Sequence, residues 1–224
     1  MNDLLTLPWE STDDSSPIAA RMAAWAAREV IEQRYEPGAL LTEADLAEAQ
    51  KASRTPAREA MLQLERWRLV RLVPKKGAIV TTVTRQERRD LLAVRAMFET
   101  DAVQALTLES DFAPLAADLR TLLDRQQKAL TASHPLDFAS ADYAFHARII
   151  RSGGNTIVDE MLTTMGPRLA RLTYQAVIDN PNPLDLLFDE HAELTDLAER
   201  GDAKGFGKVV REHIKSSHFP EARK

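Results

Sequence analysis

The chain has 224 residues, 44% of them apolar, no cysteine and a formal net charge of −5 at pH 7. The lack of cysteine excludes disulfides, thiolate metal sites and thiol nucleophiles, as is usual in a reducing compartment. Residues 1–16 lack the apolar run of a signal peptide, and no segment approaches the roughly 20 apolar residues of a membrane span. We therefore expect a cytoplasmic protein with no membrane partner and a flexible tail over residues 1–16.

Three helices are predicted at the N-terminal end of the chain. The first carries an apolar stripe at helical spacing and ends before the breaker sequence Glu36-Pro37-Gly38. Its stripe consists of Ala19, Met22, Ala23, Ala26 and Val30. The second starts near Glu43, with Leu41, Leu46 and Ala49 as candidates for its buried side. The third follows Ser53 or Thr55, either of which offers an oxygen to cap it, and has Pro56 in its first turn.

The third helix and the segment after it have the pattern of a DNA-reading unit. Ala57, Ala60, Met61 and Leu64 share one helical face and should be buried, which turns Thr55, Arg58, Glu59 and Leu62 outward. Residues 69–73 and 78–83 alternate as strands around a turn that contains Lys75 and Lys76. We expect a winged helix-turn-helix over residues 17–83, with the start of the third helix facing the bases of double-stranded DNA.

Positive charge is concentrated in this segment. Residues 51–76 contain eight Lys or Arg and two acids, a formal charge of +6, so the rest of the chain carries −11. A phosphate backbone senses the local field within a Debye length of about 8 Å, so this asymmetry matters more than the net charge. An ordinary solvated charged face is the alternative interpretation.

The same residues resemble the GntR family of bacterial transcription regulators. The matching residues are Pro37-Gly38, Leu41, Asp45-Leu46-Ala47, Ser53-Arg54-Thr55-Pro56, Arg58-Glu59-Ala60, Leu62, Leu64, Leu69-Val70 and Pro74 to Gly77. The resemblance implies that Ser53, Arg54, Thr55 and Arg58 of the third helix contact DNA. It also implies DNA contacts from a wing that contains Lys75, Lys76 and Gly77. The chain departs from the family at Gln50 and Lys51, where leucine and glycine are usual, and at Arg68, where glycine is usual. A salt bridge to a neighbouring acid is the alternative role for Arg58.

Residues 86–224 are predicted to form an all-α bundle. They hold 17 Lys/Arg and 22 Asp/Glu, which argues against direct DNA contact. Helices are indicated at about 86–109, 113–130, 136–152, 156–179, 184–199 and 203–217, with breaks at Asp111 to Pro114, His134-Pro135, Gly153 to Asn155, Pro181 to Pro183 and Gly201-Asp202.

Four polar residues lie on bundle faces that should be buried. Asp142 and His146 share a face with Phe145 and Ile149, while His191 and His213 are in register with apolar residues of two further helices. A buried carboxylate is costly unless it is paired, and a divalent metal ion shared with neutral imidazoles would pair it. Three nitrogens and one oxygen suit Zn²⁺, Ni²⁺ or a similar ion. For each histidine alone, a hydrogen-bonded core residue is the alternative. His134 and His218 fall in a turn and at the chain end, and are left out.

This second part resembles the FCD ligand-binding domain of the FadR subgroup of GntR regulators. The resemblance rests on Arg95 with Glu99, Asp142 with Phe145-His146, Gly154-Asn155, His191 and His213. It implies that Asp142 and the three histidines hold a metal ion, and that a small carboxylate effector completes its coordination. Arg95 is a candidate anchor for that acid and Asn155 a second effector residue, although Arg95 could instead form a salt bridge with Glu99.

Together the two parts predict a regulator that senses an organic acid and reads an inverted-repeat operator as a homodimer. Two other interpretations stay open. Three histidines and one aspartate could activate water in a metal-dependent hydrolase, or the metal could be purely structural.

Overall fold

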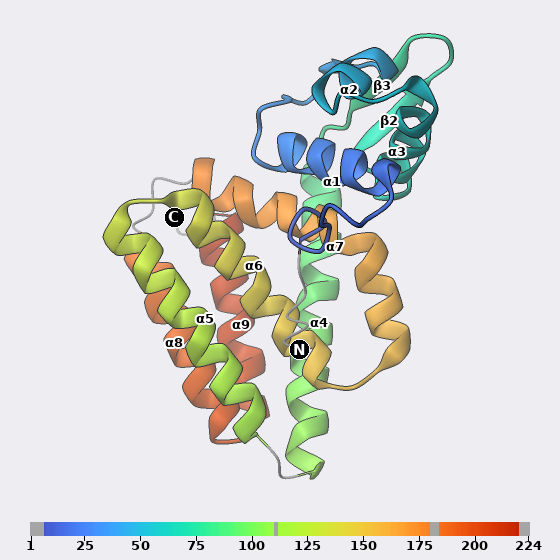
Figure 1. The fold of residues 1–224 in the computed structure, drawn as a ribbon. Helices are drawn as coiled ribbons and strands as arrows, with labels where there is room; N and C mark the ends of the chain where they lie inside the picture. The colour runs from blue at the N-terminus through green and yellow to red at the C-terminus, as the bar shows by residue number, and fades with distance from the viewer. Residues whose placement is uncertain (1–6, 110–111, 180–183, 220–224) are drawn as a thin grey trace. The chain divides into compact units, whose positions relative to one another are not determined.

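The computed structural model describes residues 7–109, 112–179 and 184–219 (Figure 1). Its elements in chain order are α1 (Ile18–Ile31), β1 (Leu40–Leu41), α2 (Glu43–Ala49), α3 (Arg54–Arg66), β2 (Val70–Val73), β3 (Gly77–Val80), α4 (Arg85–Glu109), α5 (Ala113–Ala132), α6 (Pro135–Ser152), α7 (Thr156–Asp179), α8 (Leu184–Glu199) and α9 (Ala203–His218). The predicted fold class, a winged helix-turn-helix followed by a helical bundle, is confirmed. The breaks predicted at Asp111 and at 181–183 lie outside the described residues.

The chain divides into two compact units. One comprises Thr6–Thr84 and Leu162–Arg171, and the other includes Arg85–Met161 and the chain from Leu172 onward. In the first unit, which we call the winged unit, α3 packs on both α1 and α2. Leu7 in the segment expected to be a tail is buried there, and turn hydrogen bonds to Asp13 close residues 13–16.

The winged unit contains a strand that the sequence did not predict. The antiparallel sheet has the order β1-β3-β2, with Leu41 opposite Ala78 and Val70 opposite Val80. Leu41, assigned from sequence to the buried side of the second helix, is instead buried on β1. A two-residue strand offers too little alternation to be recognised, and only its pairing with β3 defines it.

The starts of α2 and α3 are built differently. At α2, Thr42 and Asp45 form a capping box, with Asp45 N to Thr42 Oγ1 at 3.2 Å and Thr42 N to Asp45 Oδ2 at 2.8 Å. At α3, Ser53 occupies the N-cap, but the predicted side-chain cap is absent. Pro56 is the third helical residue and has no N–H, so one of the donors that a capping oxygen would use does not exist.

Turns in the winged unit lie where the chain departs from the family pattern that it resembles. Lys51 and Arg68, which replace the usual glycines, adopt left-handed conformations with φ of 49° and 54°. The backbone geometry that glycine normally provides is therefore kept, at the conformational cost of a side chain there. Gly77 is needed for a different reason, because with φ of 119° a Cβ would lie 2.4 Å from the carbonyl oxygen of Leu41.

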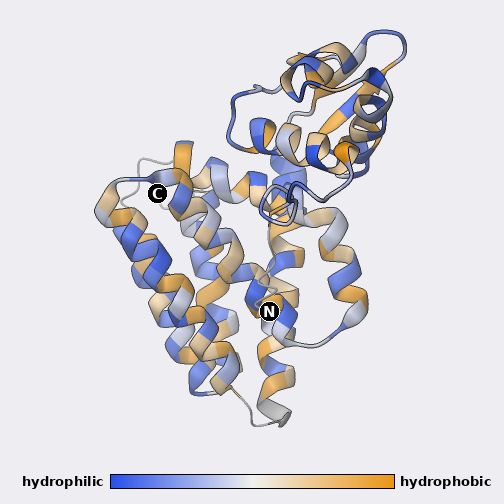
Figure 2. Ribbon diagram, viewed as in Figure 1, coloured by the Kyte–Doolittle hydropathy of each residue, from blue (hydrophilic) through white to orange (hydrophobic). Residues whose placement is uncertain are grey.

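In the second unit, the bundle, α6 lies against α4 and α5, while α9 packs on α4 and α8. Figure 2 shows hydrophobic and hydrophilic residues alternating along α5 and α8, as expected for helices with one buried face. Helix α6 is the most enclosed of these, with Phe138, Phe145 and Ile149 fully buried. No helix among the described residues is long and apolar enough to cross a membrane.

Candidate functional site

A basic groove lies between α3 and the β2–β3 hairpin. Its volume is about 710 Å³, and it is lined by Thr42, Glu43, Ala44, Arg54, Arg58, Met61, Leu62, Leu72, Val73, Pro74, Lys75, Lys76 and Gly77. The structure thus brings together five of the seven residues predicted to contact DNA. Ser53 and Thr55, the other two, are exposed at the start of α3 but do not line the groove.

The groove has the chemistry of a phosphate-binding surface. Arg54, Arg58, Lys75 and Lys76 are all exposed, and among the described residues no ion pair to an acid is found for any of them. Ala57, Ala60, Met61 and Leu64 fix the opposite face of α3 in the core, as predicted. Helix α3 therefore presents its arginines outward on a rigid support.

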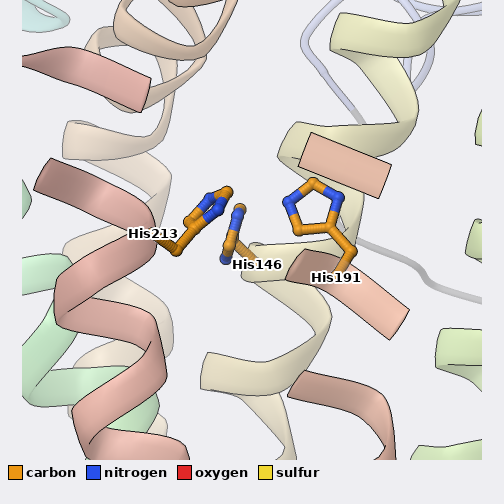
Figure 3. Close-up of side chains that lie close together, drawn as sticks. All are labelled: His146, His191 and His213. Carbon is orange, nitrogen blue, oxygen red and sulfur yellow. The ribbon is translucent and has the colours of Figure 1, made fainter. Parts of the chain in front are cut away.

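The three predicted ligand histidines converge in the bundle. His146 on α6, His191 on α8 and His213 on α9 each offer one nitrogen within 4.8 Å of the others (Figure 3). Asp142 joins them, with Oδ1 3.5 Å from Nε2 of His146 and Oδ2 3.8 Å from Nε2 of His191. All four side chains are at least 93% buried, so the cluster is shielded from solvent.

Each imidazole is oriented through its Nδ1 by an acceptor on another helix. Nδ1 of His146 lies 2.9 Å from Oε2 of Glu99, and Nδ1 of His191 lies 2.9 Å from Oε1 of Gln126. Nδ1 of His213 lies 2.7 Å from Oε2 of Glu190. In the tautomer in which each Nδ1–H donates to its acceptor, Nε2 of the neutral ring keeps a free lone pair.

Burial shifts the pKa values of all four side chains towards their neutral forms, which suits metal binding by the imidazoles and opposes it at the carboxyl. It lowers the pKa of His146 and His191 well below the usual 6.5, with the nearby cationic groups as a smaller cause. It also lowers the pKa of His213, although Glu190 partly opposes this. Burial raises the pKa of Asp142 to about 7, against the opposing effect of Arg95. Neutral imidazoles and a carboxyl that a cation would ionise form a ready ligand set.

The donor set fits a divalent metal ion. Nε2 of His146, His191 and His213 are buried and have no hydrogen-bond partner. Three unpartnered buried nitrogens aimed at one space would be costly if nothing bound there. Nitrogen ligands with one carboxylate oxygen suit Zn²⁺ and Ni²⁺, the ions expected from the sequence.

The two predicted effector residues lie in different surroundings. Arg95 is buried, with Nε 3.0 Å from Oε1 of Glu99, so the ion pair considered from the sequence is present. Glu99 thereby links Arg95 to His146, and burial raises the pKa of Glu99 to about 7. Asn155 is exposed, and its Oδ1 accepts from the backbone N of Ile157 and Val158 at the start of α7. No described contact joins Asn155 to the cluster.

Sequence reasoning missed the residues that orient the imidazoles. Gln126 and Glu190 gave no signal, because their roles depend on the packing of separate helices. His218, left out as part of a frayed end, is the last residue of α9 and only 8% exposed. The run of buried Ile214, Ser216 and Ser217 before it shows that α9 stays packed to its end.

Comparison with known proteins identifies both parts of the chain. Residues 23–80 match the family model described as bacterial regulatory proteins, gntR family, and residues 90–216 match the FCD domain. A helix-turn-helix transcriptional regulator from an unstable DNA locus of Streptomyces ambofaciens is 30% identical over 84% of this chain and 78% of its own length. The gluconate operon transcriptional repressor of Bacillus subtilis is 27% identical over 62% of this chain and 56% of its own length.

Solved structures support the fold. A GntR transcriptional regulator from Rhodococcus sp. RHA1 covers 89% of this chain and 95% of its own, with a TM-score of 0.74 and 20% identity. Escherichia coli McbR/YncC covers 90% and 95% respectively, with a TM-score of 0.74 and 22% identity. At such identities the similarity concerns the fold alone.

Proposed function

Because this chain belongs to the GntR family of bacterial regulators and carries an FCD domain, we propose that it binds an operator under the control of a metal-dependent organic-acid site. Its relatives are transcription regulators and not enzymes, so the hydrolase interpretation of the histidine cluster is set aside. The observation that carries the acid-sensing part is the convergence of three unpartnered Nε2 atoms beside Asp142.

The basic groove supports the proposed operator contacts. Arg54 and Arg58 lie on the first two turns of α3, where a recognition helix meets base edges and phosphates. A guanidinium can donate two hydrogen bonds to O6 and N7 of guanine, whereas the wing lysines neutralise phosphates without reading sequence. Ser53 and Thr55 are proposed to donate to phosphate oxygens beside them.

A selection experiment tests operator binding. Random genomic fragments of the source organism would be incubated with the full chain at about 150 mM salt, recovered and sequenced. We expect enrichment of an inverted repeat, because the two α3 helices of the proposed homodimer would read symmetric half-sites. Fragments recovered without any shared sequence would refute operator binding.

A protein that reads chromosomal DNA acts in the bacterial cytoplasm.

The metal and effector part follows from the cluster. Asp142, His146, His191 and His213 would hold a divalent ion, which would supply a Lewis-acidic position for an effector carboxylate. Glu99, Gln126 and Glu190 hold the imidazoles in place through their Nδ1 hydrogen bonds. The enclosing bundle excludes water, which strengthens the interaction with an anion.

Metal content tests this part separately from DNA binding. The full chain would be stripped with a chelator, reloaded with Zn²⁺ or Ni²⁺ and assayed for bound metal. We expect one ion per chain and a higher melting temperature, because a ligand that binds only the folded state stabilises it. His191→Gln should abolish the shift, and His134→Gln, at an exposed site, should not. A purely structural metal would give the same loading, but organic acids would then leave the melting temperature unchanged.

A further inference from the structure

Arg95 and His218, both in the bundle, carry buried nitrogens that have no hydrogen-bond partner among the described residues. Nη2 of Arg95 and Nδ1 of His218 are each buried without a hydrogen-bond partner, on side chains that are 3% and 8% exposed. Nε of Arg95 lies 3.0 Å from Oε1 of Glu99 in an ion pair, but like Nη2 it has no hydrogen-bond partner. Leaving such groups unpaired destabilises the fold, more so when they are charged.

The two donors lie on helices that pack against each other. Arg95 lies on α4 and His218 on α9, and the two helices pack against each other. Burial lowers the pKa of His218 well below 6.5, and the nearby positive charge of Arg95 is the next cause, followed by His213. His218 lies five residues after His213 on α9, and it is not among the three histidines that could share one ion.

The electrostatics around His218 favour an anion. The positive charge of Arg88, seven residues before Arg95 on α4, also lowers the pKa of His218. Nη2 of Arg88 donates a hydrogen bond to Oε1 of Gln175 at 3.0 Å, and this partner is neutral. The negative charge of Asp179 raises the pKa of Arg88, against the lowering effect of burial. Both unpartnered groups can donate and Arg95 is always charged, so a matching ligand group must accept hydrogen bonds and carry negative charge.

We propose that His218 and Arg95 form a second subsite, beside the metal position, that binds the far carboxylate of a dicarboxylic acid effector. Nη2 of Arg95 and Nδ1–H of neutral His218 donate to this carboxylate, while the other end of the acid lies at the metal position. The inference rests on the proposed metal and effector function and narrows its ligand from any small acid to a diacid. It also gives a role to a histidine that the sequence placed at a frayed end.

Matched acids test the subsite. Zn²⁺-loaded full chain would be titrated calorimetrically with succinate, glutarate and malate, each paired with the acid whose far carboxylate is a methyl group, namely butyrate, pentanoate and 2-hydroxybutyrate. We expect at least one diacid to bind about tenfold or more tightly than its partner, as for a charge-assisted hydrogen-bonded pair. His218→Gln should reduce that preference to about twofold or less, and His218→Asn serves if the first variant melts early. His134→Gln, at a side chain that is 66% exposed, should retain it.

The outcomes distinguish a failure of the proposed subsite from a failure of the proposed acid-sensing function. If monoacids bind as tightly as every diacid, or if both His218 variants keep the full preference while folded, the subsite is refuted and the acid-sensing function stands. If the ion binds but no acid of either kind does, the effector function and the subsite fail together.

Discussion

Replacing Lys75 by Ala should lower the salt dependence of operator binding without changing the fold. Lys75 is exposed at the wing tip and lines the basic groove. Its backbone is left-handed, with φ of 62°. Alanine meets the same backbone strain as lysine there, so the free energy of unfolding should change little. The loss is therefore confined to one positive charge per subunit.

The magnitude follows from counterion release. Each neutralised phosphate contributes about −0.9 to the slope of log K against log salt on duplex DNA. Two subunits on an inverted repeat lose two such contacts, so the slope should become shallower by about 1.8. Affinity should fall for all sequences alike, because a lysine on a phosphate carries no sequence information.

Fluorescence anisotropy with a labelled operator between about 50 and 300 mM KCl measures this slope. Lys75→Gln should match Lys75→Ala, since both remove the charge. Lys208→Ala, at an exposed position of α9 in the bundle, should keep the wild-type slope. An unchanged slope for a folded Lys75→Ala variant would show that the wing does not touch phosphates.

Four further outcomes are expected. Arg58→Ala should relax base preference by about 1–3 kcal/mol at one position of each half-site, seen as a flattened selection profile, while non-specific binding persists. Gly77→Ala should lower the free energy of unfolding by about 2 kcal/mol or more in denaturant titrations, because its Cβ would meet the carbonyl of Leu41 at 2.4 Å; wild-type stability would show that the turn can relax. Arg68→Gly should stabilise the fold by roughly 1 kcal/mol, since φ of 54° suits glycine, and a lower melting temperature would contradict this. In metal-free protein His218 becomes protonated near pH 6.5 in the unfolded chain but stays neutral in the folded chain. This residue therefore lowers the free energy of unfolding as the pH falls below 6.5. His218→Gln should flatten that pH dependence by up to about 1.4 kcal/mol per pH unit between pH 6.5 and 5.5.

The helices of this protein were predictable because each carries its own periodic apolar face. The stripe from Met22 to Val30 is buried as expected, and the bundle helices begin within a residue or so of their expected positions. The sheet was harder to predict from the sequence. β1 has only two residues, and β3 ends at Val80, not Val83, because its ladder with β2 stops there.

The histidine cluster was predictable for the same reason, since Asp142 and His146 interrupt an otherwise apolar face one turn apart. What surrounds the cluster was not. Gln126 and Glu190 orient their imidazoles from other helices, and helical spacing within one segment says nothing about such pairs. His218 was left out of the predicted site because the last helix was expected to fray near the chain end. In the structure the end of α9 is packed and His218 is buried.

Operator affinity should depend on the metal ion and the acid together. The same labelled inverted repeat would be titrated with chelator-stripped protein, with Zn²⁺-loaded protein, and with Zn²⁺-loaded protein saturated with the diacid that binds best. We expect the acid to change the operator Kd by about fivefold or more, and to do so only when the ion is bound. Three superimposable binding curves would contradict it.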